Sequence, residues 1–248
     1  MTRAWILSVW LLSISISSSA QEIRDRHLGF GTGYAYDALK SERVSNFTQA
    51  GATSAWQFLY RINQEKNRHH FQFYYSSSTL HSSSSGLKTD AIRGQEQYAY
   101  HRRIGTGNGR ISVFGGGVFD GNLNYRQNTT SVNLGTQKDG QLVFSLSPSV
   151  LAEMPLGKDM VAIQGWASVI AFARQSGYSL SYPAENNWLT IPTFFKIESR
   201  MSYVRYFSER WDGRLDYQFQ YYKMQKYETV IGLSHQFVFS LVYKFHKK

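Results

Sequence analysis

The segment Thr229–Phe245 alternates between two kinds of residue along almost its whole length. Its even-numbered positions are mostly small or polar. Its odd-numbered positions are mostly large and apolar: Ile231, Leu233, His235, Phe237, Phe239, Leu241, Tyr243 and Phe245. A period of two places successive side chains on opposite faces of a β-strand. The segment therefore predicts a strand with an apolar face toward lipid and a polar face toward the lumen of a transmembrane barrel.

The first twenty residues have the layout of a secretory signal peptide. Arg3 supplies a basic start, an apolar run follows from Ala4 to Ile16, and Ser18-Ser19-Ala20 ends the segment with small residues. We expect cleavage near Ala20/Gln21 and a single barrel domain over residues 21–248. An uncleaved anchor is less favoured, because a spanning helix needs about 20 apolar residues. No later run is that long, so a membrane protein of this sequence must cross as a closed barrel.

The amino-acid composition agrees with an outer-membrane location and excludes several functions. The chain has no cysteine, which excludes a disulfide framework, thiol catalysis and a thiolate metal site. The mean hydropathy of −0.39 is compatible with a barrel, because half of each strand is polar. A net charge of +10 suggests anionic neighbours, and lipopolysaccharide phosphates are the expected ones at an outer membrane. Nucleic acid is the other common partner of a basic protein, but a secreted chain would not meet it.

About ten alternating segments can be placed along the chain, with ends good to roughly two to four residues. They are Arg26–Leu39, Ala50–Ile62, His69–Leu80, Ala91–Ile104, Arg110–Asp120, Gln141–Met154, Met160–Arg174, Pro192–Phe207, Gly213–Met224 and Glu228–Phe245. Short and long links alternate between them, except that the last link, Gln225–Tyr227, is short. Bacterial barrels have short periplasmic turns and longer outer loops. A secreted β-sandwich would also alternate, but it would not require this rhythm and is less favoured.

Together, the signal peptide, the strand rhythm and the aromatic last strand resemble those of bacterial outer-membrane β-barrel proteins. The resemblance covers the mature chain as an architecture and reaches no specific functional family. It implies an all-β, antiparallel, up-and-down barrel of about ten strands, within a range of roughly eight to twelve. It also implies contact with outer-membrane lipids and assembly by the barrel-assembly machinery. That machinery usually recognises a final aromatic residue; Phe245 fits, although residues 246–248 follow it.

A barrel of this size is narrow enough for side chains to fill its interior. Strand parity predicts an inward-facing polar cluster made of Asp37, Lys196, Glu198, Arg200, Arg214 and Asp216. The favoured interpretation is an ion-paired plug that keeps the lumen closed. The alternative is a narrow polar pathway for a solute. The plug is favoured because both signs of charge are present and no single sign lines a route.

One string resembles a catalytic motif. Outer-membrane lipid hydrolases carry a His-x-Ser motif in which histidine is the base and serine the nucleophile, and His81 and Ser83 have that spacing. Those families follow the serine with asparagine, whereas Ser84 stands here, and no carboxylate is clearly placed to orient His81. A flexible serine-rich loop explains the same residues with fewer assumptions. Omptin-type proteases also have ten strands, but the predicted outer ends show no Asp-Asp or His-Asp pair.

The longest expected loops, 121–140 and 175–191, carry tyrosine, tryptophan and asparagine, which suit carbohydrate or protein contact or an outer aromatic girdle. We expect no cofactor and no metal. The sequence as a whole favours a non-enzymatic outer-membrane barrel that serves envelope structure, surface binding or an envelope system. The alternatives are a narrow solute channel and a lipid hydrolase acting through His81 and Ser83.

Overall fold

A computed structural model describes residues 25–41, 45–107, 110–128, 138–175, 185–226 and 229–245, and the expected signal peptide lies outside these ranges. The strands are β1 (Asp25–Ser41), β2 (Ser45–Asn63), β3 (Asn67–His81), β4 (Lys88–Gly107), β5 (Ile111–Asn128), β6 (Lys138–Leu156), β7 (Asp159–Ala167), β8 (Ile170–Gln175), β9 (Glu185–Thr190), β10 (Phe194–Tyr206), β11 (Trp211–Gln225) and β12 (Thr229–Phe245). No helix in the described ranges has the length and apolarity needed to cross a membrane.

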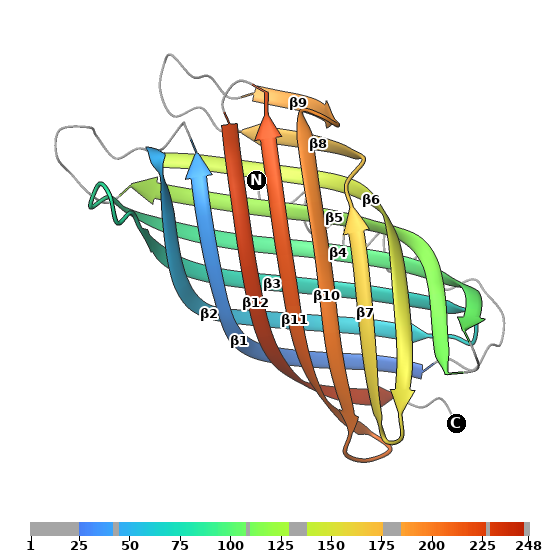
Figure 1. Cartoon of the computed structure of the whole chain (residues 1–248). Coiled ribbons are helices and arrows are strands. Elements are labelled where there is room, and N and C mark those ends of the chain that lie inside the picture. Colours follow the sequence, from blue (N-terminus) through green and yellow to red (C-terminus); the bar gives the residue numbers. More distant parts are fainter. Residues whose placement is uncertain are drawn as a thin grey trace.

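The strands form one antiparallel sheet that closes on itself (Figure 1). Described strands that follow one another in the chain pair with each other, except that β7 does not pair with β8 and β9 does not pair with β10. β1 pairs with β12 along its length and closes the sheet. Since β7 and β8 lie end to end along β6, and β9 and β10 lie along β8 and β7, twelve segments make ten barrel strands. The prediction of an all-β, up-and-down barrel of about ten strands is confirmed.

A bulge separates β7 from β8. Inward-facing positions are even-numbered in β7, where Trp166 is buried, and odd-numbered in β8, where Ala171 and Ala173 are buried. The change of parity falls at Ser168 and Val169. The Ser168 N–H donates to the Lys196 carbonyl at 2.9 Å, and the Val169 N–H donates to the Leu146 carbonyl at 3.0 Å. The bulge thus changes the strand's parity while its backbone groups stay paired.

Three expected loops are shorter than predicted, because strands extend into them. β2 begins at Ser45, β5 continues to Asn128, and β9 lies inside the expected loop 175–191. In β5 the ladder to β4 and β6 continues through residues 121–127. The asparagines and glycine of this segment look like a loop by composition. The polar barrel interior accommodates Asn122 and Asn124 instead, while Gly121, Leu123 and Tyr125 take the outward positions.

The two ends of the barrel differ. The turn end is where β1 begins, β12 finishes and the short connections β2–β3, β6–β7 and β10–β11 lie; the loop end is the opposite one, where β3 leads into β4 (Figure 1). Between them the outer face is aromatic and aliphatic. On β12, Phe237, Phe239, Leu241 and Phe245 are 45–54% exposed, and Tyr243 packs its ring 5.0 Å from that of Trp211. This is the face that lipid would cover.

Candidate functional site in the barrel interior

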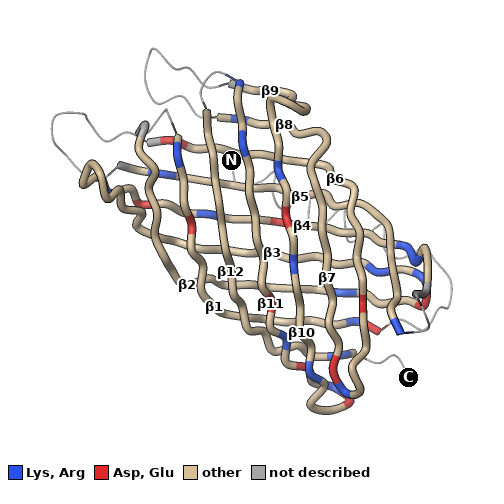
Figure 2. The backbone as a smooth tube through the Cα atoms, viewed as in Figure 1, with Lys and Arg blue, Asp and Glu red and all other residues tan. Residues whose placement is uncertain are grey.

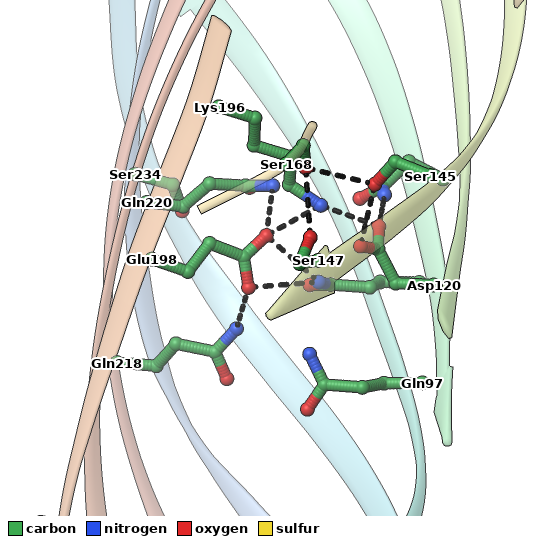
Figure 3. Close-up of polar contacts among 12 residues, drawn as sticks. Gln97, Asp120, Ser145, Ser147, Ser168, Lys196, Glu198, Gln218, Gln220 and Ser234 are labelled. Carbon is green, nitrogen blue, oxygen red and sulfur yellow. Dashed lines mark hydrogen bonds and ion pairs between the residues drawn. The ribbon is translucent and has the colours of Figure 1, made fainter. Parts of the chain in front are cut away.

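The centre of the barrel holds a buried ion-pair cluster. Lys196 and Glu198, two residues apart on β10, both point inward, and their charged atoms lie 2.6 Å apart. The Lys196 ammonium also contacts the carboxylate of Asp120 on β5 (Figure 3). All three residues are at most 2% exposed. Because β7 and β6 lie between β10 and β5 in the sheet, this contact joins strands that are not neighbours and crosses part of the lumen.

Hydrogen bonds extend this cluster around the interior. Glu198 accepts from the side-chain amides of Gln220 at 2.6 Å, Gln218 at 3.2 Å and Gln95 at 3.3 Å. On the other side, Asp120 accepts from the Ser145 hydroxyl at 2.7 Å. Figure 3 shows Glu198, Gln218, Gln220, Asp120 and Ser145 converging from several strands. A network in which each charge has several partners is rigid.

A second layer lies next to it, toward the turn end. Arg200 donates to Gln97 at 2.7 Å and to Gln218 at 3.1 Å, and its guanidinium lies 5.5 Å from the centre of the Trp166 ring. Arg214 forms an ion pair with Asp216 at 2.7 Å. The two layers together are termed the polar plug: Asp120, Lys196, Glu198, Arg200, Arg214 and Asp216. Figure 2 shows that charged positions occur along the length of the strands and not only at their ends.

Above the plug, toward the loop end, lies a pocket with about 680 Å³ of empty space, part of it open to solvent. Its walls include the side chains of Leu39, Leu80, Val143 and Phe194, each at most 8% exposed, which belong to one apolar cluster. Lys196 and Gln220 also line it, along with Asn122 and Ser234. The pocket therefore combines apolar walls with the polar surface of the plug.

Two further ion pairs flank the pocket. Arg93 on β4 lies 3.1 Å from Asp37 on β1, and Arg126 on β5 lies 3.2 Å from Asp139 on β6. Both arginines line the pocket, and each has its counter-charge. The pocket lining therefore also contains arginine side chains whose charges are already paired.

The structure places all six residues of the predicted inward cluster inside the barrel. It brings Lys196 to Glu198 and Arg214 to Asp216, whereas Asp37 lies apart from them beside Arg93. Sequence reasoning missed the cross-barrel partner Asp120, as well as Arg126 and Asp139. Continuing the period of two beyond the expected end of the fifth strand would have placed Asn122, Asn124 and Arg126 inward.

The residues of the expected catalytic motif lie elsewhere. His81 ends β3 and Ser83 follows in the turn, and both are exposed. Within the described ranges no hydrogen bond joins them, and the nearby Asp90 accepts from Thr79 at 2.8 Å. Of the described residues, no three histidine or acidic side chains gather in a way that could hold a metal ion.

The expected loop residues divide between the two faces. Asn122 and Arg126 are buried in the interior, which corrects their expected place on an outer loop. Trp188, on β9, is 71% exposed and packs against Phe172 with ring centroids 5.3 Å apart. Tyr178 and Tyr182, which were expected in the same loop, lie outside the described residues.

Solved outer-membrane barrels share this fold. The chain is similar to the outer membrane protease OmpT from Escherichia coli, at 6% identity and a TM-score of 0.57, over 92% of this chain and 99% of that one. It also matches the translocator domain of the autotransporter NalP from Neisseria meningitidis, at 10% identity and a TM-score of 0.46, over 98% and 96%. Neisserial surface protein A (NspA) matches at 10% identity and a TM-score of 0.41, over 89% and 97%.

These likenesses concern the fold alone. No protein-family model matches the chain, and no curated protein sequence does. The class is nevertheless defined: the chain is a closed, ten-stranded β-barrel of the bacterial outer-membrane type. Within this class the interior and the loop end, rather than the fold, determine what a barrel does.

Proposed function

We propose that the protein is a closed, non-enzymatic outer-membrane barrel that binds a small amphipathic molecule at its loop end. The observation that carries this proposal is the position of the polar plug directly beneath the pocket. Lys196 belongs to both, and Gln220, which lines the pocket, donates to Glu198 of the plug. A molecule that enters from the loop end meets apolar walls and then a polar floor. Such a pocket suits a ligand with an apolar body and a hydrogen-bonding head.

The plug also argues against the channel alternative. Its ion pairs join Lys196 to Glu198 and to Asp120, and Arg214 to Asp216, and all of these side chains are at most 2% exposed. Opening a path would leave buried ions without partners, which costs about 3–5 kcal/mol for each broken pair. The pairs are therefore expected to stay closed at rest.

The orientation follows from the strand count. With an even number of strands, the first strand begins and the last strand finishes at the same end of the barrel, here the turn end. That end is periplasmic in bacterial barrels. The loop end and its pocket then face the cell exterior. The outer-membrane origin of the structural neighbours supports this location. Outer-membrane lipids, lipopolysaccharide among them, and the barrel-assembly machinery are the partners that we propose.

Conductance measurements test the closed lumen. Purified protein reconstituted into planar lipid bilayers is expected to give no conductance steps in concentrated potassium chloride, because the polar plug blocks the lumen. Heat-modified gel mobility of the same sample would show that the barrel is folded. A steady conductance that changes in Arg200→Ala would contradict the proposal and favour a channel.

A pocket-filling variant tests binding. Val143→Trp places a large side chain among the apolar walls and is expected to reduce ligand occupancy about tenfold, since overpacking costs roughly 1–3 kcal/mol. The measurement is native mass spectrometry of protein purified from outer membranes, which reads a bound small molecule as added mass. The control is Leu146→Trp, on the outer face of the same strand, which should leave occupancy unchanged. A wild-type protein without added mass, or equal loss in both variants, would count against the pocket.

A further inference from the structure

Three arginines and a histidine face one another inside the barrel, on the turn-end side of Lys196 and Glu198. They are termed the arginine layer: Arg61 on β2, His70 on β3, Arg200 on β10 and Arg214 on β11. Arg200 lies 3.2 Å from the Nδ1 atom of His70. Arg61 is opposite His70 in the ladder between β2 and β3, and it lies near the charges of Arg200 and Arg214 as well as those of Glu153 and Asp216. Four residues from four different strands therefore converge on one part of the lumen.

Positive charge exceeds negative charge in this layer. The nearby carboxylates already have cationic partners: Asp216 pairs with Arg214 at 2.7 Å, Glu153 with Arg68 at 3.0 Å and Glu198 with Lys196 at 2.6 Å. Within the part of the chain that the structure describes, neither Arg61 nor Arg200 forms an ion pair. Buried ions that lack a counter-charge are strongly unfavourable. Arg61 and Arg200 therefore share carboxylates that already pair with other cations, so the layer carries an excess of positive charge.

Hydrogen-bond donors in the same layer also lack acceptors. The Nε atom of Arg200 and one terminal nitrogen of Arg214, Nη1, have no partner among the described residues, and both side chains are 2% exposed. A guanidinium has donors and no acceptors. The missing partner must therefore be an acceptor, and the excess positive charge selects a negatively charged one.

We propose that the arginine layer binds a small inorganic anion, a halide or an oxyanion such as phosphate, between Arg61, Arg200 and Arg214. The anion balances the guanidinium charges and accepts from the free donors of Arg200 and Arg214. This site is separate from the loop-end pocket, and it does not depend on the ligand proposed there. Its occupant is part of the folded structure, as a counter-ion within the closed lumen.

Anion-dependent stability tests the proposal. The unfolding midpoint of detergent-purified protein is read from gel mobility after heating in sodium chloride, phosphate or gluconate at matched ionic strength. Chloride or phosphate is expected to raise the midpoint by about 5 °C over gluconate when its concentration far exceeds the dissociation constant. The salt that acts at the lower concentration identifies the halide or the oxyanion. A midpoint that follows ionic strength alone would overturn the proposal.

Variants locate the effect. Arg61→Gln removes one positive charge from the layer and is expected to abolish most of the anion-dependent shift. Arg174→Gln makes the same change at an exposed position on β8 and should retain the shift. An equal shift in both variants would place the anion elsewhere.

A measurement on the wild-type protein does not depend on how well a variant folds. Crystals grown in sodium bromide are expected to show anomalous scattering from bromide between the three guanidiniums if the occupant is a halide. If the stability series selects phosphate, electron density of tetrahedral shape is expected there instead. Density explained by water alone would contradict the proposal.

Discussion

Glu198→Ala is expected to lower the free energy of unfolding by about 3–5 kcal/mol, the cost of removing one partner from a buried ion pair. Glu198 is 1% exposed and accepts from Lys196 and from three glutamine amides. The variant leaves those donors without an acceptor in a closed interior, where water cannot easily replace the carboxylate. Urea unfolding from lipid vesicles, followed by tryptophan fluorescence, measures the change.

The chain supplies a matched control on its outer face. Glu96 lies on β4 at an outward, half-buried position, so Glu96→Ala removes the same group without opening the plug. We expect this control to be neutral or slightly stabilising, because acidic side chains on a lipid-facing surface carry a modest cost. A Glu198→Ala variant as stable as the control would show that the ion-pair cluster contributes little to the barrel.

Alternation along single strands made most of the fold predictable. In β12 nearly every residue falls on the face that its polarity suggests, because lipid and lumen impose opposite demands on neighbouring positions. The same parity placed Lys196, Glu198 and Arg200 on the inner face of β10. The polarity of each face and the period of two depend only on residues close together in the chain. They can therefore be predicted without knowing which strand lies across the barrel.

Partners across the lumen could not be predicted in this way. Lys196 meets Asp120, which lies 76 positions earlier in the chain. Parity gives the face of a residue, but the wall that it meets depends on the tilt and stagger of the closed sheet. For the same reason the pocket walls, which come from strands as distant as β1 and β10, form no pattern in the sequence. The long β5 was missed because inward asparagines resemble a loop.

Gly33→Ala is expected to prevent most of the protein from reaching its folded form, because Gly33 lies where the barrel closes. Gly33 lies on β1 opposite Val238 on β12, in the seam that joins the first and last strands. A methyl group on Gly33 would overlap the carbonyl oxygen of Phe237 and would lie 2.6 Å from the Val238 Cα atom. Both obstacles are backbone atoms, which cannot move aside as a flexible side chain can.

The neighbouring strands hold this backbone in place. Gly33 is opposite Ala55 of β2 as well as Val238, so a shift away from β12 disturbs the ladder on the other side. We expect a loss of about 3 kcal/mol or more, at the upper end of the cost of overpacking. The measurement is the fraction of protein that shows heat-modifiable gel mobility after refolding into detergent.

Gly165→Ala provides the comparison, since a methyl group at this exposed position on β7 would have no neighbour within 4 Å. That variant should stay within about 0.5 kcal/mol of the wild type. Both substitutions add one methyl group to a strand glycine, so a difference between them reports the space at each position and not a general effect of replacing glycine. Equal folding of the two would mean that β1 and β12 do not approach as closely at Gly33 as described, and the seam would then tolerate side chains along its whole length.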